Sequence, residues 1–349
     1  MPAALGGLTV DRRRFLFAVA ATGAAALPFV PRPAKAQSRT AVVDLWRSRI
    51  GAILARGGLP IIDMQATYLA ETNIARMIEF MDRLDVALIA FAPANAPNSQ
   101  PSLALHGRYP DRFIPTTNSG EFPRWWNNPA AFLAGVKNEL KSGQYFLMGE
   151  HEFRHYPSPE QVQAGQSQRD ITIPIDGPAG DALFRLGEDS GVPFQIHYDV
   201  EDRLLPPFEA MLTRHPKAKV IWCHLGMVRY PDRAKLYGPA YVRGLIERFS
   251  GLHFDLAVPA PNNIYRPSGA RDSTIYRDGK LDPAWRDLLE THADRFVVGS
   301  DYRLPIEARY GDNIERVRSL ILAALSEPTR QAIAYGNAWR LTTGSAWTA

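Results

Sequence analysis

The stretch PFQIHYDVEDRLLPPFEAMLTRHPKAKVIWCHLG, residues 193–226, decides the fold. It contains two short apolar runs that each end in a histidine, Phe194–His197 and Val220–His224. Between them, Pro206–His215 carries apolar residues at helical spacing and stops at Pro216, which cannot continue a helix. Two parallel strands joined by a helix, each with a histidine at its C-terminal tip, are typical of the active-site face of a (β/α)8 barrel.

The rest of the chain continues this alternation of β-rich apolar runs and helical patterns, which indicates a parallel sheet. Eight runs are predicted to be strands: Leu59–Met64, Val86–Ala92, Phe113–Thr117, Tyr145–Gly149, Phe194–His197, Val220–His224, Leu252–Leu256 and Phe296–Gly299. The predicted helical segments are Thr72–Leu84, Pro129–Lys141, Pro178–Ser190, Pro206–His215, Ala240–Phe249, Pro283–His292, Asn313–Leu325 and Pro328–Trp339. This rhythm predicts an α/β fold of the (β/α)8 TIM-barrel kind. A doubly wound open sheet is the alternative, but it usually has fewer strands and a Gly-rich phosphate loop after the first.

Three connections are long for simple turns between a strand and a helix: Gly120–Asn128, Glu150–Gly177 and Ala257–Leu281. All three follow predicted strands, so they belong to the face where barrels do chemistry. We interpret them as substrate loops, and surface insertions are the alternative.

The first 36 residues have the features of an export signal. Asp11–Leu16 (DRRRFL) resembles the twin-arginine motif, the apolar stretch Ala18–Val30 follows, and Ala34–Ala36 is an A-x-A cleavage site. A membrane anchor is the alternative, but Gly23 and Pro28 interrupt a run that is already short for a bilayer. We therefore expect a cleaved signal peptide, residues 1–36, and a single exported domain, residues 37–349, in the periplasm or outside the cell.

Removing this segment changes the charge balance. The whole chain has 40 basic and 36 acidic residues, and residues 1–36 hold five of the basic residues and one of the acidic residues, which leaves 35 of each. A neutral mature chain lacks the electrostatic footprint of a nucleic-acid-binding protein. Cys223 is the only cysteine, so an intrachain disulfide is excluded. We expect a small-molecule substrate and no stable membrane anchor after cleavage, and homo-oligomerisation stays open.

Four predicted strand ends carry groups that could bind a divalent ion or move a proton: Glu150, His197, His224 and Asp301. Imidazoles and carboxylates that converge on one mouth can fill three positions of a metal site and leave one for water. Such an ion would lower the pKa of that water or polarise a substrate carbonyl. Each residue alone has a plain structural explanation, and only the coincidence of four at one barrel mouth favours a site.

Several segments, in the right order over nearly the whole mature chain, resemble the amidohydrolase superfamily, in particular its amidohydrolase-related branch (amidohydrolase family 2) of single-metal hydrolases and decarboxylases. They are Ile61–Asp63, Tyr109–Ile114 (YPDRFI), Met148–Glu150, Ile196–His197, Cys223–Gly226 (CHLG), Gly299–Asp301 and Gly336–Leu341 (GNAWRL). The resemblance implies a barrel of the metal-dependent-hydrolase type, with His197 and Asp301 as metal ligands. It also implies that His224 lies against the metal-bound water or the substrate.

The first strand departs from this family. Two metal-binding histidines normally follow its aspartate, and this chain has Gln65 and Thr67 at those positions, after Asp63. An amide or hydroxyl oxygen is a weak ligand for zinc. Three outcomes stay open: Glu150 and His224 complete a rebuilt site, the barrel works without metal through histidine and carboxylate acid–base chemistry, or only ligand binding remains.

We therefore expect an exported amidohydrolase-like enzyme that hydrolyses a C–O or C–N bond of, or decarboxylates, a small acidic or aromatic compound. His224, Asp301 and Glu150 are the candidate catalytic residues, and His197, Asp301 and Glu150 are the candidate ligands of a divalent metal, with zinc favoured. Gln65, Thr67, Tyr198 and Arg229 are the candidate substrate-binding residues, since arginine forks suit carboxylates. A catalytically inactive ligand-binding barrel and a metal-independent lactonase-like hydrolase are the alternatives.

Overall fold

The computed structural model describes residues 38–94, 96–303 and 307–348. All of them belong to the unit Ala36–Ala349, one of two into which the chain divides. The predicted signal peptide, residues 1–36, lies outside the described residues. Within those residues, no helix combines the length and the apolar character needed to span a bilayer.

The centre of the described unit is a ring of parallel strands. They are β1 (Ile61–Tyr68), β2 (Val86–Pro93), β3 (Phe113–Pro115), β4 (Met148–His155), β6 (Phe194–Tyr198), β7 (Val220–Trp222), β8 (Leu252–Asp255) and β13 (Phe296–Val297). The pairing runs β1-β2-β3 in one sheet and β4-β6-β7-β8-β13 in the other. Isolated parallel bridges join Thr116 to Leu147 and Asp63 to Val298, so the order of neighbours returns to β1. The predicted (β/α)8 barrel is confirmed.

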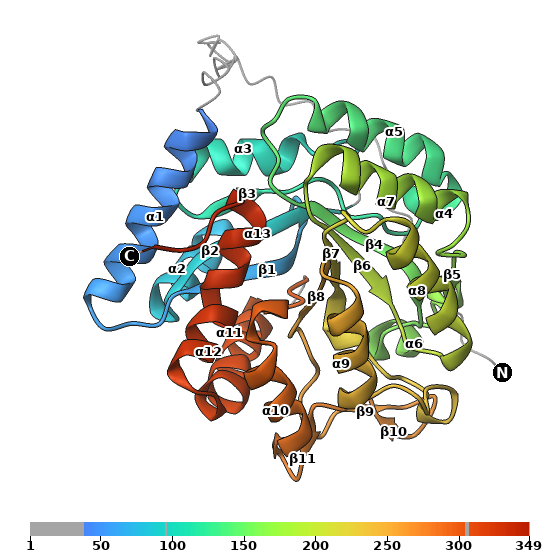
Figure 1. The fold of residues 1–349 in the computed structure, drawn as a ribbon. Helices are drawn as coiled ribbons and strands as arrows, with labels where there is room; N and C mark the ends of the chain where they lie inside the picture. The colour runs from blue at the N-terminus through green and yellow to red at the C-terminus, as the bar shows by residue number, and fades with distance from the viewer. Residues whose placement is uncertain (1–37, 95, 304–306, 349) are drawn as a thin grey trace, which may run out of the picture. The chain divides into compact units, whose positions relative to one another are not determined.

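Helices surround these strands in Figure 1. They are α1 (Arg39–Ala55), α2 (Ile74–Arg83), α3 (Gln100–Arg108), α4 (Arg124–Asn127), α5 (Pro129–Leu140), α6 (Pro159–Gln163), α7 (Pro178–Ser190), α8 (Leu205–Arg214), α9 (Pro239–Arg248), α10 (Pro283–Thr291), α11 (Glu307–Arg316), α12 (Glu327–Gln331) and α13 (Asn337–Thr343). Several start as their sequences predict. Asn128 caps α5 and Asp282 caps α10, each followed by a proline at the first helical position.

The core lies between the strands and this helical layer. The strand residues Ile62, Leu88 and Trp222 are fully buried, and the Trp222 ring packs edge-on against Phe208 of α8 at 4.7 Å between ring centroids. This packing explains why the apolar runs identified the strands, since strands of a parallel barrel are covered on both faces.

Several elements differ from the sequence predictions. β4 extends to His155 instead of ending at Gly149, because Glu150, Glu152 and Arg154 continue the strand with polar side chains that have buried partners. β1 likewise continues past Met64 to Tyr68. The predicted last helical pair is interrupted by π-helical turns at Val317–Ile321 and Ala332–Gly336. The helices α1, α3, α4 and α6 were not predicted.

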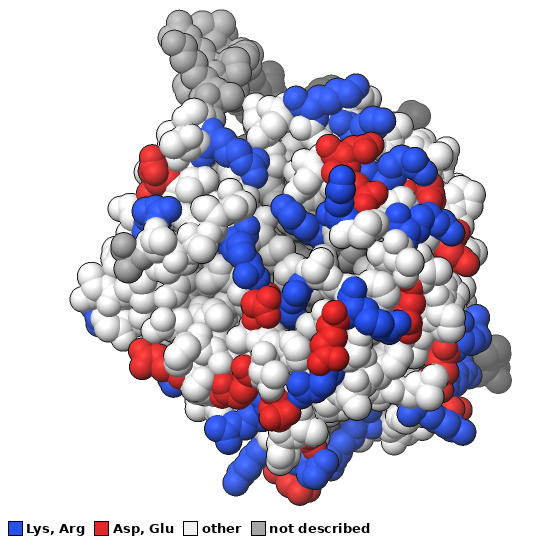
Figure 2. Space-filling view, in the orientation of Figure 1, with Lys and Arg blue, Asp and Glu red and all other residues white. Residues whose placement is uncertain are grey.

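The three long connections contain short ordered elements. β5 (Ile171–Thr172) pairs antiparallel with β4, and the connection after β8 forms two hairpins, β9 (Ile264–Tyr265) with β10 (Ala270–Arg271) and β11 (Tyr276–Arg277) with β12 (Lys280–Leu281). On the face shown in Figure 2, basic and acidic residues are interspersed, which agrees with the equal numbers of the two in residues 37–349.

Candidate metal centre

Three side chains from three neighbouring strands meet at the barrel mouth. His197 lies near the end of β6, His224 directly after β7, and Glu150 inside β4. His197 Nδ1 is 2.8 Å from Glu150 Oε1, His224 Nε2 is 3.1 Å from the same oxygen, and the two nitrogens are 3.1 Å apart. We call these three residues the donor triangle. Both histidines are buried, and the Glu150 side chain is 12% exposed.

The position of His224 depends on an unusual backbone. His224 and Leu225 both have left-handed conformations, with φ of 60° and 51°. Non-glycine residues rarely adopt such values, and they cluster at functional sites where the surroundings enforce them. The buried carboxylate of Asp255 accepts the His224 N–H at 2.7 Å, and Tyr237 donates its hydroxyl to the Leu225 carbonyl at 2.7 Å. Gly226 follows because a Cβ there would lie 2.6 Å from the Tyr237 hydroxyl oxygen.

The ring nitrogens that point away from the donor triangle each face an oxygen atom. His224 Nδ1 lies 3.2 Å from the carbonyl oxygen of Ala257, and His197 Nε2 lies 3.5 Å from Asp199 Oδ1. In metal sites, such outer acceptors fix the tautomer and the orientation of a ligating imidazole. In each ring, one nitrogen therefore faces the other members of the triangle, and the second nitrogen faces an oxygen atom outside it.

The charges in the triangle strongly affect one another. Burial lowers the pKa of His197, but Asp199 and Glu150 raise it to about 9, and Asp301 and Glu150 likewise raise the pKa of buried His224 to about 10. Burial raises the pKa of Glu150, but hydrogen bonds from the two histidines lower it well below its usual value. Without an ion, protons on both rings balance the surrounding carboxylates.

The β1 side of the mouth supplies an amide instead of a histidine. Gln65 Nε2 donates to Glu150 Oε2 at 2.8 Å and lies 3.4 Å from Asp301 Oδ1. The register of β1 shifts between Asp63 and Ala66, and the Gln65 carbonyl accepts the Asp301 N–H at 3.0 Å. Thr67 is buried on the same strand, and among the described residues its side chain makes no hydrogen bond to the donor triangle.

The structure brings Asp301 to the mouth but not into the triangle. Its side chain is 51% exposed, and its Oδ2 is 4.0 Å from His224 Nδ1. The geometry thus groups His224 with Glu150 and His197, whereas the sequence suggested Asp301 as the third ligand. The assignment of individual roles stays a prediction.

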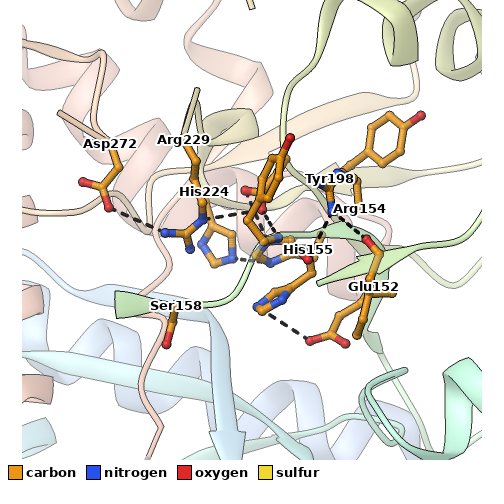
Figure 3. A network of polar contacts seen from close by, with 12 residues as sticks. Glu152, Arg154, His155, Ser158, Tyr198, His224, Arg229 and Asp272 are labelled. Atoms are coloured by element: carbon orange, nitrogen blue, oxygen red, sulfur yellow. Dashed lines mark hydrogen bonds and ion pairs between the residues drawn. The ribbon is translucent and has the colours of Figure 1, made fainter. Parts of the chain in front are cut away.

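The two remaining candidates lie outside the triangle. Tyr198 is buried against the helical layer and donates its hydroxyl to the Leu204 carbonyl at 3.0 Å. Arg229 is buried, with Nε 3.5 Å from Asp199 Oδ2 and Nη1 3.7 Å from Asp272 Oδ2, and Figure 3 shows it pointing toward Asp272.

Sequence reasoning missed a second polar group next to His197. The His155 ring lies 4.7 Å from the His197 ring, its Nε2 lies 4.0 Å from Glu152, and Glu152 pairs with Arg169. Burial, together with the nearby Glu121, raises the pKa of Glu152 to about 7. The sequence MGEHEFRH contains the signal, since a strand that continued past Glu150 places Glu152 on the same face.

The donor triangle fits a divalent metal ion. Its two nitrogens and one carboxylate oxygen are a donor set that zinc uses, together with one open position, in catalytic sites. Ligand atoms about 2.0–2.1 Å from a tetrahedral ion lie about 3.3 Å from one another. The observed separations of 2.8–3.1 Å are close to that spacing. Glu150, His197 and His224 could therefore hold a metal ion.

The fold and this centre define a (β/α)8-barrel enzyme with a candidate metal site, and sequence comparison agrees. The family model described as amidohydrolase matches residues 117–341, well over half of the chain. The protein therefore belongs to the amidohydrolase family and is an enzyme of that type. The matched region includes the donor triangle but not Gln65 and Thr67. A comparison with curated proteins found no match.

Solved structures with a similar arrangement share little sequence with this chain. An organophosphorus hydrolase from Deinococcus radiodurans has 13% identity and a TM-score of 0.49, with coverage of 81% of this chain and 92% of that chain. A 2,6-dihydroxybenzoate decarboxylase from Rhizobium has 13% identity and a TM-score of 0.47, with 81% and 98% coverage. A 4-oxalomesaconate hydratase from Rhodopseudomonas palustris has 16% identity and a TM-score of 0.45, with 86% and 91% coverage.

Proposed function

We propose that this protein is an exported metal-dependent enzyme that hydrolyses a C–O or C–N bond of, or decarboxylates, a small acidic or aromatic compound. One observation carries the proposal: Glu150, His197 and His224 place three donor atoms at ligand spacing, and the outer nitrogen of each ring faces its own oxygen. This is the arrangement of a three-ligand site with an open position.

In this proposal each residue at the mouth has a distinct task. The ion, when bound, acts as a Lewis acid toward a substrate oxygen or toward water. Glu150, His197 and His224 hold it, and Gln65 keeps the Glu150 carboxylate in place through its amide N–H. Asp301 is half exposed and anchored by its backbone to β1, so it can take a proton from a bound reactant and return it.

The substrate class is supported by two side chains that follow strand ends. The side chain of Arg303, after β13, is 37% exposed and pairs with buried Glu121. Trp126, in α4 after β3, is 41% exposed and packs on Phe122 at 5.5 Å between ring centroids. A guanidinium group and an indole ring suit a carboxylate and an aromatic ring respectively.

A metal-independent hydrolase is the second candidate. The observation that favours it is the pair of hydrogen bonds from the two histidines to Glu150. Glu150 Oε1 accepts from both histidines, so two protons can occupy the centre of the triangle and the rings can act as acid and base. Metal content and chelator sensitivity separate the two candidates.

The test combines metal analysis with an activity screen. Protein purified without added metal is assayed for bound zinc, and then for turnover of esters, lactones, amides and aromatic carboxylic acids before and after treatment with a chelator. We expect close to one equivalent of zinc after reconstitution and activity that follows the zinc content. His197→Gln and His224→Gln should abolish both, and His292→Gln, a histidine that pairs with Glu247 on the helical layer, should keep both. Undiminished activity in a zinc-free protein would support the metal-independent candidate instead.

Export is a separate part of the proposal, supported by the motif and the A-x-A site in residues 1–36. Mass spectrometry of the exported protein should find Gln37 at the N-terminus. The double variant Arg12→Lys and Arg13→Lys should accumulate the precursor inside the cell. An exported form that keeps Met1 would contradict the prediction of a cleaved signal.

A further inference from the structure

His197 and Asp199 carry two buried polar atoms that face each other without a hydrogen bond. His197 Nε2 and Asp199 Oδ1 are 3.5 Å apart, and neither has a hydrogen-bond partner among the described residues. Asp199 is almost fully buried at 1% exposure. Buried polar atoms without partners are rare in proteins, so this pair needs an explanation.

The other oxygen of Asp199 is firmly held. Asp199 Oδ2 accepts the backbone N–H of Tyr156, just beyond β4, at 2.7 Å, and it lies 3.5 Å from Arg229 Nε. The carboxylate can therefore not turn its Oδ1 away from His197 without losing the bond from Tyr156. Asp199, just beyond β6, is therefore held by the connections after β4 and β7, the two strands that pair with β6.

Arg229 extends this chain of contacts to the long connection after β8. Its Nη1 lies 3.7 Å from Asp272, which accepts two hydrogen bonds from Asn263 at 2.9 Å, and its guanidinium lies 4.9 Å from the Tyr265 ring centroid. In Figure 3 Arg229 and Asp272 form the outer end of the network that contains His224 and His155. Arg229 thus lies between two buried carboxylates, and one of them faces a donor of the triangle.

We propose that Asp199 is a positioning residue that keeps the proton of His197 on Nε2, so that Nδ1 is free to bind the metal ion. Asp272, through Arg229, supports Asp199 in this role. The inference rests on the proposed metal-dependent function and goes beyond it, because it assigns the control of metal affinity to a network outside the donor triangle. It also gives the connection after β8 a role in building the metal site.

The substitution Asp199→Asn tests the tautomer directly. The Tyr156 N–H requires an acceptor, so the amide oxygen of the asparagine takes the place of Oδ2 and its NH2 group turns toward His197. Nε2 must then accept a hydrogen bond, which moves the ring proton to Nδ1, the atom that faces the triangle. The size and burial of the side chain hardly change, but the wrong tautomer is favoured, as is known for other histidine–carboxylate pairs.

The experiment compares zinc affinity, measured by calorimetry on the mature protein, among the wild type and three variants. Asp199→Asn should bind zinc about 10–100-fold more weakly, the range for losing an outer partner of a ligand, and Asp272→Asn should show a smaller loss. Asp278→Asn is the matched control, since it makes the same change at an exposed position of the same connection, in a left-handed conformation that asparagine tolerates. It should bind zinc like the wild type.

Two further readouts separate positioning from general damage. A single cooperative thermal transition and an unchanged circular dichroism spectrum should show that metal-free Asp199→Asn keeps its fold, and ¹⁵N NMR of the zinc-loaded wild type should show His197 protonated at Nε2. A wild-type zinc affinity in Asp199→Asn, or zinc bound to His197 Nε2, would overturn this inference and leave the proposed function intact. A wild type that binds no zinc would overturn the proposed function as well, so the two failures are distinguishable.

Discussion

The two sides of the barrel mouth differ in what they offer to a metal ion. On one side, β4, β6 and β7 supply the carboxylate and the two imidazoles of Glu150, His197 and His224 within hydrogen-bond distance of one another. On the other side, β1 supplies Gln65, whose amide N–H donates a hydrogen bond to Glu150, and Thr67, for which the described residues show no side-chain hydrogen bond to the donor triangle. Toward Glu150, one side presents two imidazole nitrogens and the other presents an amide N–H.

In the proposed site, this difference gives the two sides of the mouth different tasks. An N–H group cannot bind a cation, but it can fix the carboxylate that does. β1 still ends at the site and is still held there, because the Gln65 carbonyl accepts the N–H groups of Ser300 and Asp301. In the proposed site, β1 therefore positions Glu150, and the donor atoms come from β4, β6 and β7.

The largest expected effect is the loss of a donor from the β6–β7 side. His197→Ala and His224→Ala should each lower zinc affinity by more than about 100-fold, beyond the effect of losing an outer partner. Titration calorimetry of the metal-free protein measures this. If a variant of either histidine binds zinc as tightly as the wild type, that histidine is not a metal ligand.

Restoring two histidines on β1 should have the next largest effect, in the opposite direction. In the double variant Gln65→His and Thr67→His, each added imidazole contributes a directed bond, so zinc affinity should rise by at least about tenfold and zinc should raise the melting temperature further than in the wild type. Competition with a chelator measures the gain. If the wild type already resists the chelator as well as the double variant, the triangle alone is a complete site.

A third prediction concerns Asp63, a buried residue of β1, and its effect on how the free energy of unfolding changes with pH. Burial raises the pKa of Asp63 from 3.8 to about 7. Between about pH 4 and pH 7 the unfolded chain has released this proton and the folded chain still holds it, so this carboxyl lowers stability as pH rises, by up to about 1.4 kcal/mol per pH unit. Asp63→Asn has no such proton, so its free energy of unfolding should fall less with pH.

Urea titrations at pH 4.5, 5.5 and 6.5 measure this difference, and the wild type is the reference at each pH. The other buried carboxyls are present in both proteins, so the difference between the two curves reports on Asp63 together with its electrostatic coupling to buried Asp255. Parallel curves would mean that Asp63 is ionised throughout this range.

The smallest effect should separate the two β1 positions. Gln65→Leu removes the N–H that holds Glu150, which should weaken zinc binding by about tenfold. Thr67→Val changes the neighbouring site residue on the same strand without touching the triangle, and its zinc affinity should equal that of the wild type. Equal losses in both variants would show that β1 acts through packing rather than through the amide.

The sequence predicted the barrel because its strands are buried on both faces and its helices are amphipathic, and both patterns are local. It also located Glu150, His197, His224 and Asp301 at one mouth, since parallel strands end on the same side. It could not show that His224 faces Glu150, because that depends on two left-handed residues held by Asp255 and Tyr237. Nor could it show that Gln65 would donate to Glu150, since that contact joins residues 85 positions apart through a local register shift.

The central claim is that Glu150, His197 and His224 together hold one divalent ion. Anomalous diffraction at the zinc absorption edge, from crystals of the mature protein with one equivalent of zinc, tests it most directly. We expect one anomalous peak in contact with Glu150, His197 Nδ1 and His224 Nε2. A peak bound by Asp301 and Gln65 without His224, or no peak at the barrel mouth, would contradict it.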